Sequence, residues 1–427
     1  MQTRDDFHLN DIYTGATNFF GNTDPQTLAE TYGTPLYVYN ETILRNRCRE
    51  LAHLVDYSNF KVNYSAKANT NLSLLRIIHE EGLLVDAMSP GEIFIELKAG
   101  FTPEEILFIC NNVSGEEMRY AVEAGVMVSV DSISQLDQFG RMFRGGKVAI
   151  RINPGVGAGH HEKVITGGKN TKFGIDPLYL NELKQTLLRY NLHLAGINQH
   201  IGSLFMTAET YLEAAGVLLD IAEEFPDLEF VDFGGGFGIP YHKKDGEARL
   251  DLIALGSKLQ QLIDERIVGT GRNLTVKVEP GRYTVAECGV LLGRVHSVKM
   301  NGGKKYVGTD IGFNVLARPV LYDAYHEIEV YGNAKREDGA EGPVTVVGNI
   351  CETGDILARD RSLPVMMEGD LIGILDAGAY GMVMSSNYNC RLRPAEVLIS
   401  DEDRPVLIRK RDDHSDLLRH FPQEQAV

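Results

Sequence analysis

The chain has 427 residues, which is more than a single hydrophobic core usually serves, and two domains are therefore expected. Hydrophobic residues make up 43% and charged residues 24%, as in an ordinary globular protein, and no apolar run approaches the roughly 20 residues that a membrane span needs. The formal net charge of −17, from 42 Lys and Arg against 59 Asp and Glu, repels phosphate backbones and anionic membranes, so neither nucleic acid nor a membrane is expected as a partner.

Residues 1–6 contain neither the basic start nor the apolar run of a secretory signal, and a cytoplasmic protein is expected. The five cysteines are odd in number and scattered along the chain. This pattern is typical neither of a disulfide framework nor of a zinc site, and we expect no bound metal.

In chain order, residues 1–30 are turn-rich and polar, a strand is predicted at 35–39, and Asn40 is expected to cap a helix over 43–55. From residue 61 onward, short β-rich runs alternate with segments of helical period. Strands are predicted at 61–66, 83–88, 106–110, 126–131, 148–153, 194–200, 229–233 and 275–279. Helices are predicted between them, at 71–81, 90–98, 115–124, 132–143, 177–190, 207–225 and 249–268.

This alternation predicts a (β/α)8 TIM barrel, because strands that alternate with helices pair in parallel through right-handed crossovers. A doubly wound open sheet is the alternative, but it gives no reason for eight units. Barrel active sites collect at the C-terminal ends of the strands. Polar residues or glycines end the predicted strands, at Lys67, Asp86, Asn111, Asn112, Asp131, Arg151, Asn153, Gln199, His200, residues 234–236 and Glu279.

After Arg282 the pattern changes to short alternating strands with Gly, Asn and Asp turns, predicted at 290–296, 305–307, 345–347, 371–374 and 396–399. We therefore expect a barrel domain of residues 31–282 and an antiparallel β-sandwich or barrel-like domain of residues 283–427, which residues 1–30 join. The charged segment 335–342 is predicted to be a hairpin tip or loop. The polar tail after Asp401 is expected to fray.

Lys67 ends the first barrel strand and is followed by Asn69, which is expected to cap the next helix. An amine at the C-terminal end of a barrel strand points into the mouth of the barrel, where partial burial favours the neutral form that attacks a carbonyl. Taken alone, a lysine at a strand end is more often solvated. The glycines and acids farther along the chain favour a Schiff-base role.

Gly234, Gly235 and Gly236 follow the seventh strand, and consecutive glycines let backbone N–H groups converge on an anion. A tight strand-to-helix turn is the alternative for these glycines alone. The segment 279–282, Glu-Pro-Gly-Arg, follows the eighth strand, and barrels often bind a phosphate between the loops after strands seven and eight. The two loops together predict a phosphate site.

Glu279 and His200 are predicted to face the same ligand. A carboxylate beside a pyridine nitrogen keeps that nitrogen protonated, which makes the ring an electron sink. The His200 imidazole has room to stack on such a ring, although a lone histidine is more often a satisfied core residue. With Lys67 opposite and Ser203 in reach of the phosphate, a cofactor site is favoured.

Seven motifs occur in the order of a known family: Tyr64-Ser-Ala-Lys-Ala-Asn69, Asp86-Ala-Met-Ser-Pro-Gly-Glu92, His200-Ile-Gly-Ser203, Gly234-Gly-Gly-Phe-Gly-Ile239, Glu279-Pro-Gly-Arg282, Cys351-Glu-Thr-Gly-Asp355 and Ala377-Gly-Ala-Tyr-Gly381. Together they resemble the alanine-racemase-like, fold type III pyridoxal-phosphate decarboxylases. Within that class the chain is most similar to the meso-diaminopimelate decarboxylase family. The resemblance runs from about residue 30 to residue 400.

The resemblance implies that Lys67 holds pyridoxal 5′-phosphate as a Schiff base, that Glu279 pairs with the pyridine nitrogen, and that His200 and Asp86 also belong to the cofactor site. It implies a phosphate region formed by Ser203, Gly235, Gly236, Gly281, Arg282 and Tyr380. It further implies that Cys351 manages protonation at the reacting carbon from a second subunit. A homodimer with shared active sites is therefore expected.

The resemblance also implies a substrate with a charged far end. Arg282 and Arg318 would clamp its distal carboxylate, because a planar guanidinium binds a carboxylate through two hydrogen bonds. Tyr322 and Tyr380 would line that end, and Glu352 would accept the distal ammonium. The implied reaction is decarboxylation of meso-2,6-diaminopimelate to L-lysine and CO2, the last step of lysine biosynthesis. The alternative for Arg318 is a structural pair with an acid of the β domain.

Three alternative functions stay open. A racemase would use a tyrosine base and would not favour a carboxylate at the ring nitrogen, so Glu279 argues against it. A decarboxylase of D-ornithine or D-lysine would need a distal site that differs by a single contact. A non-catalytic relative that only binds the cofactor would have lost the lysine or the cysteine, and Lys67 and Cys351 are both present. The loop at 155–172 is further predicted to be a mobile lid.

Overall fold

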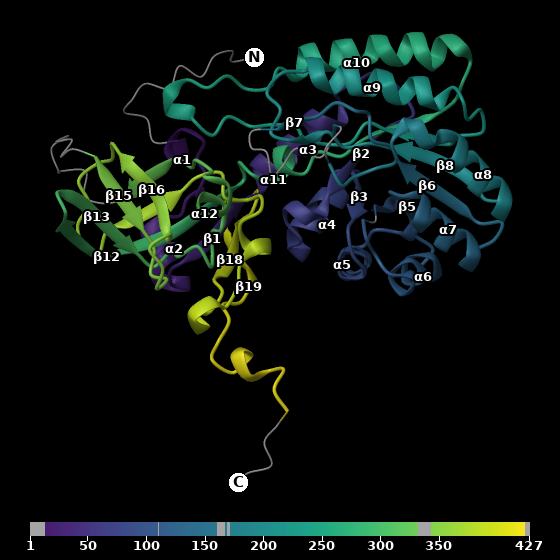
Figure 1. Cartoon of the computed structure of the whole chain (residues 1–427). Coiled ribbons are helices and arrows are strands. Elements are labelled where there is room, and N and C mark those ends of the chain that lie inside the picture. Colours follow the sequence, from purple (N-terminus) through teal and green to yellow (C-terminus); the bar gives the residue numbers. More distant parts are fainter. Residues whose placement is uncertain (1–12, 110, 160–166, 169–170, 332–342, 423–427) are drawn as a thin grey trace. The chain divides into compact units, whose positions relative to one another are not determined.

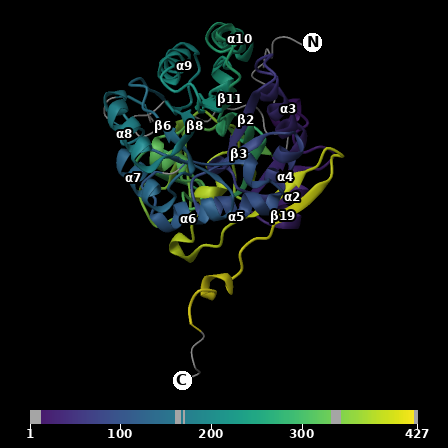
Figure 2. The ribbon, with the colours of Figure 1, turned by 90° about the vertical axis from the view of Figure 1, so that its right-hand side faces the viewer.

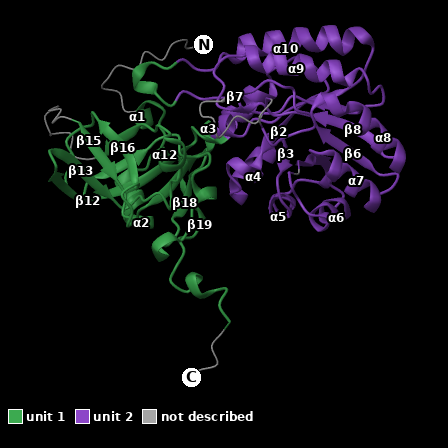
Figure 3. Cartoon of the chain, viewed as in Figure 1, with its two compact units in different colours: residues 1–43, 241–247, 285–427 green, residues 44–240, 248–284 purple. Residues whose placement is uncertain are grey.

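The computed structural model describes residues 13–109, 111–159, 167–168, 171–331 and 343–422. They form two compact units (Figure 3): unit 1 combines Met1–Ile43, Tyr241–Glu247 and Val285–Val427, and unit 2 combines Leu44–Pro240 and Ala248–Thr284. Compared with the predicted barrel range of 31–282, residues 31–43 and 241–247 belong to unit 1 instead. The predicted loop at 335–342 and the central part of the predicted lid at 155–172 lie outside the described residues.

Unit 2 is a closed barrel of parallel strands, and each of the eight predicted barrel strands is present. In order around the barrel the strands are β10 (Phe230–Asp232), β11 (Thr275–Val278), β2 (Phe60–Ser65), β3 (Leu84–Ala87), β4 (Ile106–Ile109), β5 (Met127–Val130), β6 (Lys147–Arg151) and β8 (His193–Asn198). Leu107, Ala149, Ala195 and Phe230 pack in one buried cluster. The predicted TIM barrel is confirmed.

The predicted barrel helices are also present, and Figure 2 shows them around the strands. They are α4 (Leu72–Glu80), α5 (Pro90–Ala99), α6 (Gly115–Glu123), α7 (Ile133–Met142), α8 (Leu180–Tyr190), α9 (Glu209–Ala222) and α10 (Leu252–Arg266). Serine side chains cap several of them: the hydroxyl groups of Ser89, Ser114 and Ser132 each accept a backbone N–H of the first turn.

The predicted cap of α4 is wrong by two residues. Lys67 lies in a short 3₁₀ helix, η1 (Ala66–Ala68), so the chain needs one more turn before α4 begins. Asn71 is the N-cap, since its Oδ1 accepts the N–H of Ser73 at 2.9 Å. Asn69 instead accepts the N–H of Asn71 at 2.9 Å and orders the turn between the two helices.

A two-stranded pair that the sequence did not predict adds to the barrel. Strands β7 (Ala158–Gly159) and β9 (Gly202–Ser203) run parallel, and a bridge joins Phe205 to Phe237. Both contacts lie just after barrel strands β6, β8 and β10 end, and they order the loop that carries Ser203.

Unit 1 is built on a nine-stranded sheet. The main path of the sheet runs through β16 (Ile356–Arg361), β15 (Val344–Val347), β13 (Lys304–Thr309), β12 (Gly289–Asn301), β1 (Leu36–Asn40), β18 (Ala395–Ile399) and β19 (Pro405–Arg409). Strand β17 (Leu371–Ile374) pairs with both β12 and β14 (Ile328–Tyr331). The predicted β domain is confirmed, but its sheet is mixed, because β1 with β18 and β13 with β15 are parallel pairs.

The N-terminal residues belong to unit 1 because they cover its apolar core. Helices α1 (Tyr13–Ala16) and α2 (Pro25–Tyr32) precede β1, and Phe19, Leu28, Val38, Leu292 and Val397 share one buried cluster. The sequence places the strand at 35–39 correctly but assigns it to the barrel domain, whereas it pairs with β12 and β18. Asn40 caps the helix that follows, as predicted, by accepting the N–H of Ile43 at 2.8 Å.

The chain after Asp401 is more ordered than predicted. Strand β19 pairs antiparallel with β18, with Leu398 opposite Val406 (Figure 1). The tail after Asp401 is mostly polar apart from Val406, Leu407 and Ile408, and the sequence therefore predicts a frayed tail. Among the helices of the described ranges, none is both long and apolar enough to cross a membrane.

Candidate active site

Lys67 lies on η1, directly after β2, and its side chain is half-buried. Ser65, two residues before Lys67, connects the ends of three strands. Ser65 donates its hydroxyl hydrogen to Oδ2 of Asp86 at 2.8 Å, and it lies 3.2 Å from the carbonyl oxygen of Glu279. The C-terminal ends of β2, β3 and β11 are therefore tied together, and Lys67, Asp86 and Glu279 are brought to one end of the barrel, as predicted.

Two of these residues are fully buried carboxyl groups. Burial, followed by the charge of Glu279, raises the pKa of Asp86 well above its usual range, although Lys67 opposes this. Burial also raises the pKa of Glu279, and Lys67 and Arg151 act against the shift. Burial thus favours the protonated form of Glu279, and the positive charges of Lys67 and Arg151 oppose this without reversing it.

His200 contacts the glycine turn after β10 and the buried Glu279. Its Nδ1 lies 3.2 Å from the backbone N–H of Gly235 and 3.6 Å from Oε2 of Glu279. Because a backbone N–H can only donate, Nδ1 is the acceptor and carries no proton. Burial, with Lys67 and Arg151 nearby, also keeps the pKa of His200 well below its usual value. His200 is thus a neutral ring, and its contact with Glu279 is not an ion pair.

The glycine turn after β10 leaves no room for side chains. Gly234 and Gly236 have φ of 74° and 105°, a region that favours glycine. A Cβ on Gly235 would lie 1.9 Å from the carbonyl oxygen of Glu279, and one on Gly236 would lie 2.7 Å from that of Gly202. The turn is locked by Asp232, whose Oδ1 accepts the N–H of Gly234 at 2.9 Å.

The segment after β11 completes this end of the barrel. Arg282 is buried, and its Nη2 donates to Oγ of Ser203 at 2.8 Å. A Cβ on Gly281 would lie 3.0 Å from that of Ser65, so the backbone there passes close to β2. Ser203, Gly235, Gly236, Gly281 and Arg282 are thus gathered on neighbouring loops, as the sequence predicts for a phosphate site.

These residues fit pyridoxal 5′-phosphate. Oε1 of Glu279 is buried and accepts no hydrogen bond from an N–H or hydroxyl group of the residues that the structure describes, although the Asp232 carboxyl group contacts Glu279, so a protonated ring nitrogen would satisfy it. The closely packed glycines provide backbone N–H groups for a phosphate, and Lys67 provides the amine for an aldehyde. The donor set therefore matches each functional group of the cofactor.

Sequence reasoning missed two ionisable residues of the barrel, the buried Asp232 and the half-buried Lys277. Asp232 lies beside Glu279, and burial followed by the Glu279 charge raises the pKa of Asp232 well above its usual range. Burial lowers the pKa of Lys277, which Asp232 and Glu279 oppose. Both residues precede the predicted strand ends. Both could have been noticed in the sequence, because each is an ionisable residue within a mainly apolar strand, Asp232 in β10 and Lys277 in β11.

In unit 1, Arg318 begins the short helix α12 (Arg318–Tyr322) and is only 1% exposed. Its Nη1 lies 2.7 Å from Nε2 of His326, and its guanidinium carbon lies 4.7 Å from the centre of the Tyr241 ring. Nδ1 of His326 lies 2.7 Å from the carbonyl oxygen of Leu375. Since arginine has no acceptor, Nε2 of His326 accepts and Nδ1 donates, which fixes a neutral tautomer that orients Arg318.

Cys351 and Glu352 are exposed neighbours in the loop between β15 and β16. Nδ2 of Asn389 donates to Sγ of Cys351 at 3.2 Å, and Tyr388 donates its hydroxyl hydrogen to Oε1 of Glu352 at 2.5 Å. Asp355 orders the same loop by accepting the N–H of Ile350 at 2.7 Å. Neither Tyr388 nor Asn389 was predicted. Asn389 lies 38 residues after Cys351 in the sequence, and no local motif connects the two.

The remaining predicted residues also lie in unit 1. Tyr322 ends α12 and is half-buried, and Tyr380 follows β17 with a left-handed φ of 56°. The structure thus places the predicted cofactor residues of the barrel in unit 2, and Arg318, Tyr322, Cys351, Glu352 and Tyr380 in unit 1. Within the described ranges, no three His, Cys, Asp or Glu side chains are grouped in a way that would hold a metal ion.

Comparison with known proteins gives one consistent result. The family model of the pyridoxal-dependent decarboxylases, pyridoxal binding domain, matches residues 41–286. A diaminopimelate decarboxylase of Methanothermobacter thermautotrophicus is 44% identical over 93% of this chain and 94% of its own length. That of Escherichia coli K12 is 34% identical over 92% and 94%.

Solved structures agree with these relatives. The crystal structure of Helicobacter pylori diaminopimelate decarboxylase complexed with L-lysine superposes with a TM-score of 0.83 at 32% identity, and the match covers 93% of this chain and 98% of that one. Fold, site residues and relatives therefore lead to the same assignment. The chain belongs to the diaminopimelate decarboxylase family of pyridoxal-dependent decarboxylases.

Proposed function

We propose that this protein decarboxylates meso-2,6-diaminopimelate to L-lysine and CO2 with pyridoxal 5′-phosphate as its cofactor, the last step of lysine biosynthesis. The relatives named above carry this activity in their names and match nearly the whole chain. The observation in this chain that carries the proposal is the surroundings of Glu279. One buried oxygen of Glu279 accepts no hydrogen bond from an N–H or hydroxyl group of the described residues, while His200, the glycine turn and Lys67 gather at the same barrel end.

The cofactor, when bound, supplies an electron sink, which accepts the electron pair that is released when the bond between the α-carbon and its carboxylate breaks. Lys67 holds the cofactor through its amine, and Glu279 keeps the ring nitrogen protonated. The neutral His200 ring covers one face of the site, and Asp86 orients Ser65 beside Lys67. The phosphate would be bound by Ser203, Gly235, Gly236, the backbone groups of Gly281 and Arg282, and the hydroxyl group of Tyr380.

We further propose that charged and aromatic residues recognise the far end of the substrate. Arg318 and Arg282 bind the distal carboxylate, and the tautomer of His326 holds the Arg318 guanidinium in one orientation for this task. Glu352 accepts the distal ammonium, and Tyr322 and Tyr380 line that end. Binding energy at the far end then decides which carboxylate is presented for loss.

The last step is uptake of one proton by the α-carbon after CO2 leaves, and Cys351 or Lys67 delivers it. We propose that Cys351 and Glu352 come from the second subunit of a homodimer, whose active sites are therefore shared, and that the enzyme is cytoplasmic. The exposure of Cys351 and Glu352 on their own chain supports this assignment.

The test is CO2 release from the cofactor-loaded enzyme with meso-diaminopimelate, D-lysine and D-ornithine, each measured with the wild type and with Arg318→Lys. We expect turnover of diaminopimelate alone. Arg318→Lys retains the positive charge but loses the paired N–H donors with which a guanidinium group binds a carboxylate. It should raise KM for diaminopimelate by about tenfold.

Lys67→Ala is the control, which should lose both turnover and the absorbance band of the lysine-bound cofactor. Faster turnover of D-lysine or D-ornithine would replace the proposed substrate with a diamino monoacid. A bound cofactor without CO2 release from any of the three would support the non-catalytic alternative.

A further inference from the structure

A loop of residues 386–391 lies against the segment that carries Cys351 and Glu352. Three successive contacts connect them: Tyr388 donates to Glu352, Asn389 bonds to Cys351, and Nη2 of Arg391 donates to the carbonyl oxygen of Asn349 at 2.8 Å. This loop contains η8 (Tyr388–Cys390) and belongs, like its partners, to unit 1. The position of Cys351 and Glu352 therefore depends on loop 386–391.

Asn389 binds Cys351 through both ends of its amide. Its Oδ1 accepts the N–H of Cys351 at 3.1 Å, and its Nδ2 lies 3.2 Å from Sγ. The orientation of the amide follows from chemistry, because a backbone N–H only donates and must face Oδ1. The NH2 group consequently faces the sulfur. One side chain thus fixes the backbone of Cys351 and donates a hydrogen bond to its reactive atom.

The backbone of loop 386–391 favours asparagine at this position. Asn389 has φ 55° and ψ 25°, and Cys390 has φ 53°, so two successive residues are left-handed. Asparagine and aspartate tolerate this conformation better than other residues with a side chain. An Asn389→Asp variant therefore keeps the backbone while it changes the group that faces the sulfur.

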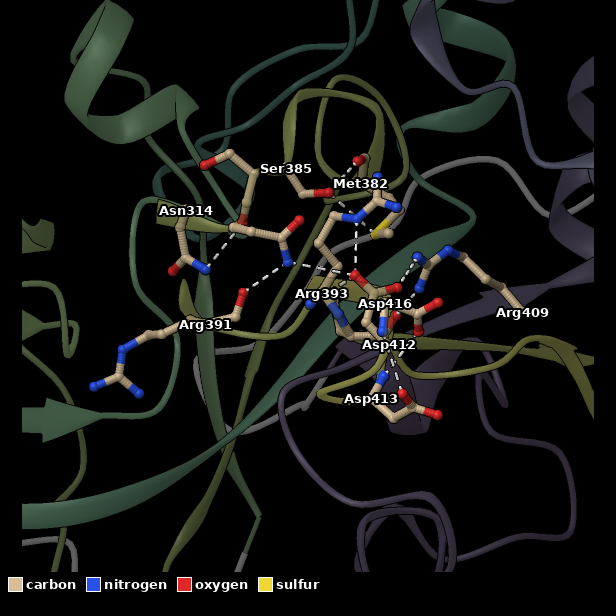
Figure 4. A network of polar contacts seen from close by, with 12 residues as sticks. Asn314, Met382, Ser385, Arg391, Arg393, Arg409, Asp412, Asp413 and Asp416 are labelled. Atoms are coloured by element: carbon tan, nitrogen blue, oxygen red, sulfur yellow. Dashed lines mark hydrogen bonds and ion pairs between the residues drawn. The ribbon is translucent and has the colours of Figure 1, made fainter. Parts of the chain in front are cut away.

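The start of the loop is anchored by contacts with Asn314 and Asp412, two residues that Figure 4 labels. The carbonyl oxygen of Asn314 accepts the N–H of Ser386 at 2.8 Å. Oδ2 of Asp412 accepts a hydrogen bond from Nδ2 of the next residue, Asn387, at 3.4 Å, and another from Nε of Arg393, just beyond the loop, at 3.1 Å. The contacts to Cys351 and Glu352 are thus made by an anchored loop.

Tyr388 makes a second, separate contact. Its hydroxyl group donates to Oε1 of Glu352 at 2.5 Å, and its ring stacks on Phe313 with the ring centres 5.7 Å apart. The ring contact and the hydrogen bond together connect one carboxylate oxygen of Glu352 to loop 386–391.

We propose that Asn389 and Tyr388 are positioning residues with different tasks: Asn389 supports proton delivery by Cys351, and Tyr388 orients Glu352 for the distal ammonium of the substrate. The proposal rests on the proposed roles of Cys351 and Glu352. When Sγ gives its proton to the α-carbon it becomes a thiolate, which later regains a proton from water. The Nδ2–H group of Asn389 stabilises the charge that forms on Sγ, and this contact strengthens as the reaction proceeds.

The first test is Asn389→Asp. It keeps an acceptor for the Cys351 N–H but places a carboxylate oxygen where the NH2 group donated, which disfavours the thiolate. We expect kcat to fall by about tenfold or more with KM within about twofold. Asn191→Asp is the matched control, an exposed left-handed asparagine with φ 51° that ends α8, and it should leave both constants unchanged.

A second readout does not depend on turnover. In a Cys390→Ser background, the rate of iodoacetamide alkylation at Cys351 is followed by mass spectrometry of the peptide. Asn389→Asp should slow this rate by at least about threefold, because the thiolate is the nucleophile. An unchanged alkylation rate together with an unchanged kcat would show that Asn389 is only a structural residue. If Cys351→Ala leaves kcat unchanged while Asn389→Asp still slows alkylation, the proposed role of Cys351 fails but the contact stands.

Tyr388→Phe tests the other task. The ring and its stacking are kept and only the hydroxyl group is lost, so we expect KM for diaminopimelate to rise about threefold to tenfold with kcat nearly unchanged. Glu352→Gln should raise KM at least as much. If Tyr388→Phe lowers kcat and leaves KM unchanged, the division of tasks is wrong. If Glu352→Gln has no effect on KM, the proposed role of Glu352 fails instead.

Discussion

Glu96 is a buried acid of the barrel whose protonation state can be tested by experiment. It lies on α5, is fully buried, and neither of its carboxylate oxygens has a hydrogen-bond partner among the described residues. Burial, followed by the charges of Glu92 and Asp86, raises the pKa of Glu96 to about 9. Glu96 is therefore a neutral acid at neutral pH, and it avoids the cost of a buried unpaired charge.

This predicts a pH dependence of stability that Glu96→Gln removes. Between an unfolded pKa of about 4.3 and the folded pKa, the native state binds more protons than the unfolded state. The free energy of unfolding therefore falls as pH rises through this window, by up to about 1.4 kcal/mol per pH unit. Urea denaturation at pH 5, 6.5 and 8 should show a flatter pH dependence for Glu96→Gln than for the wild type.

The control for this experiment is Glu116→Gln, which removes an exposed carboxylate from the first turn of α6. It should leave the slope against pH unchanged. Equal slopes for the wild type and Glu96→Gln would mean that Glu96 is ionised in the folded protein. The comparison of slopes is unaffected by any constant cost of placing an amide at this buried position.

A second prediction at the residue scale concerns Glu279→Gln. The amide has nearly the shape of the carboxylate but cannot hold a proton on the ring nitrogen by charge, so the electron sink is weakened. We expect kcat to fall by about two orders of magnitude, the effect typical of losing an electrostatic partner where charge develops. The absorbance band of the cofactor should persist because Lys67 is intact. A kcat within about threefold of the wild type would remove Glu279 from the proposed role.

At the scale of elements, the turn after β10 is predicted to tolerate no side chain. In Gly235→Ala the new Cβ would lie 1.9 Å from the carbonyl oxygen of Glu279, so the backbone of one of the two loops must move. We expect the Kd of pyridoxal 5′-phosphate, measured by fluorescence titration, to rise by at least about tenfold. Gly216→Ala in α9 is the control, because a Cβ there meets no atom within 4 Å.

The Kd values of the two variants show whether the glycine turn binds the phosphate or has only a structural role. If Gly235→Ala binds the cofactor as tightly as the wild type does, the glycine turn is not part of the phosphate site. If both glycine variants lose affinity equally, the effect is a general loss of stability. Gly216→Ala should be neutral or slightly stabilising, since alanine favours a helix.

The repeating elements were predictable from sequence, and those made by distant pairing were not. The eight barrel strands are short, mainly apolar runs with a polar residue or a glycine at or near the C-terminal end, and all of them are present. By contrast, β1 follows the same local rules but pairs with β12 and β18. Strand β19 is a short apolar run, Val406 to Ile408, within an otherwise polar tail, and it is fixed by its pairing with β18. Local pattern defines a strand, whereas its partner is decided by the rest of the chain.

The same distinction applies to the candidate site. Lys67, Glu279 and the glycines end strands and were found from their positions. Lys277 lies within a strand, and His326 and Asn389 act through Arg318 and Cys351, so their importance depends on contacts that only the fold creates. Only Asp232 and Lys277 could have been identified locally, because each is a polar residue within a mainly apolar strand.

At the scale of the whole molecule, the shared active site makes a prediction about mixtures. Lys67→Ala and Cys351→Ala should each be nearly inactive alone. If Cys351 serves the active site of the other subunit, a dimer of one variant with the other contains one site with both residues intact and one with neither. Random reassociation of equal amounts should then restore about a quarter of the wild-type sites, measured as CO2 release.

The matched control mixes Lys67→Ala with Glu279→Gln, two changes in the same barrel. In that mixture every site lacks one of the two residues, so no activity should return. Restoration by the first mixture and not by the second would place Cys351 in trans to Lys67. If the first mixture stays as inactive as its components although the subunits have exchanged, then Cys351 and Lys67 act within one chain, and the dimer is not needed to complete the site.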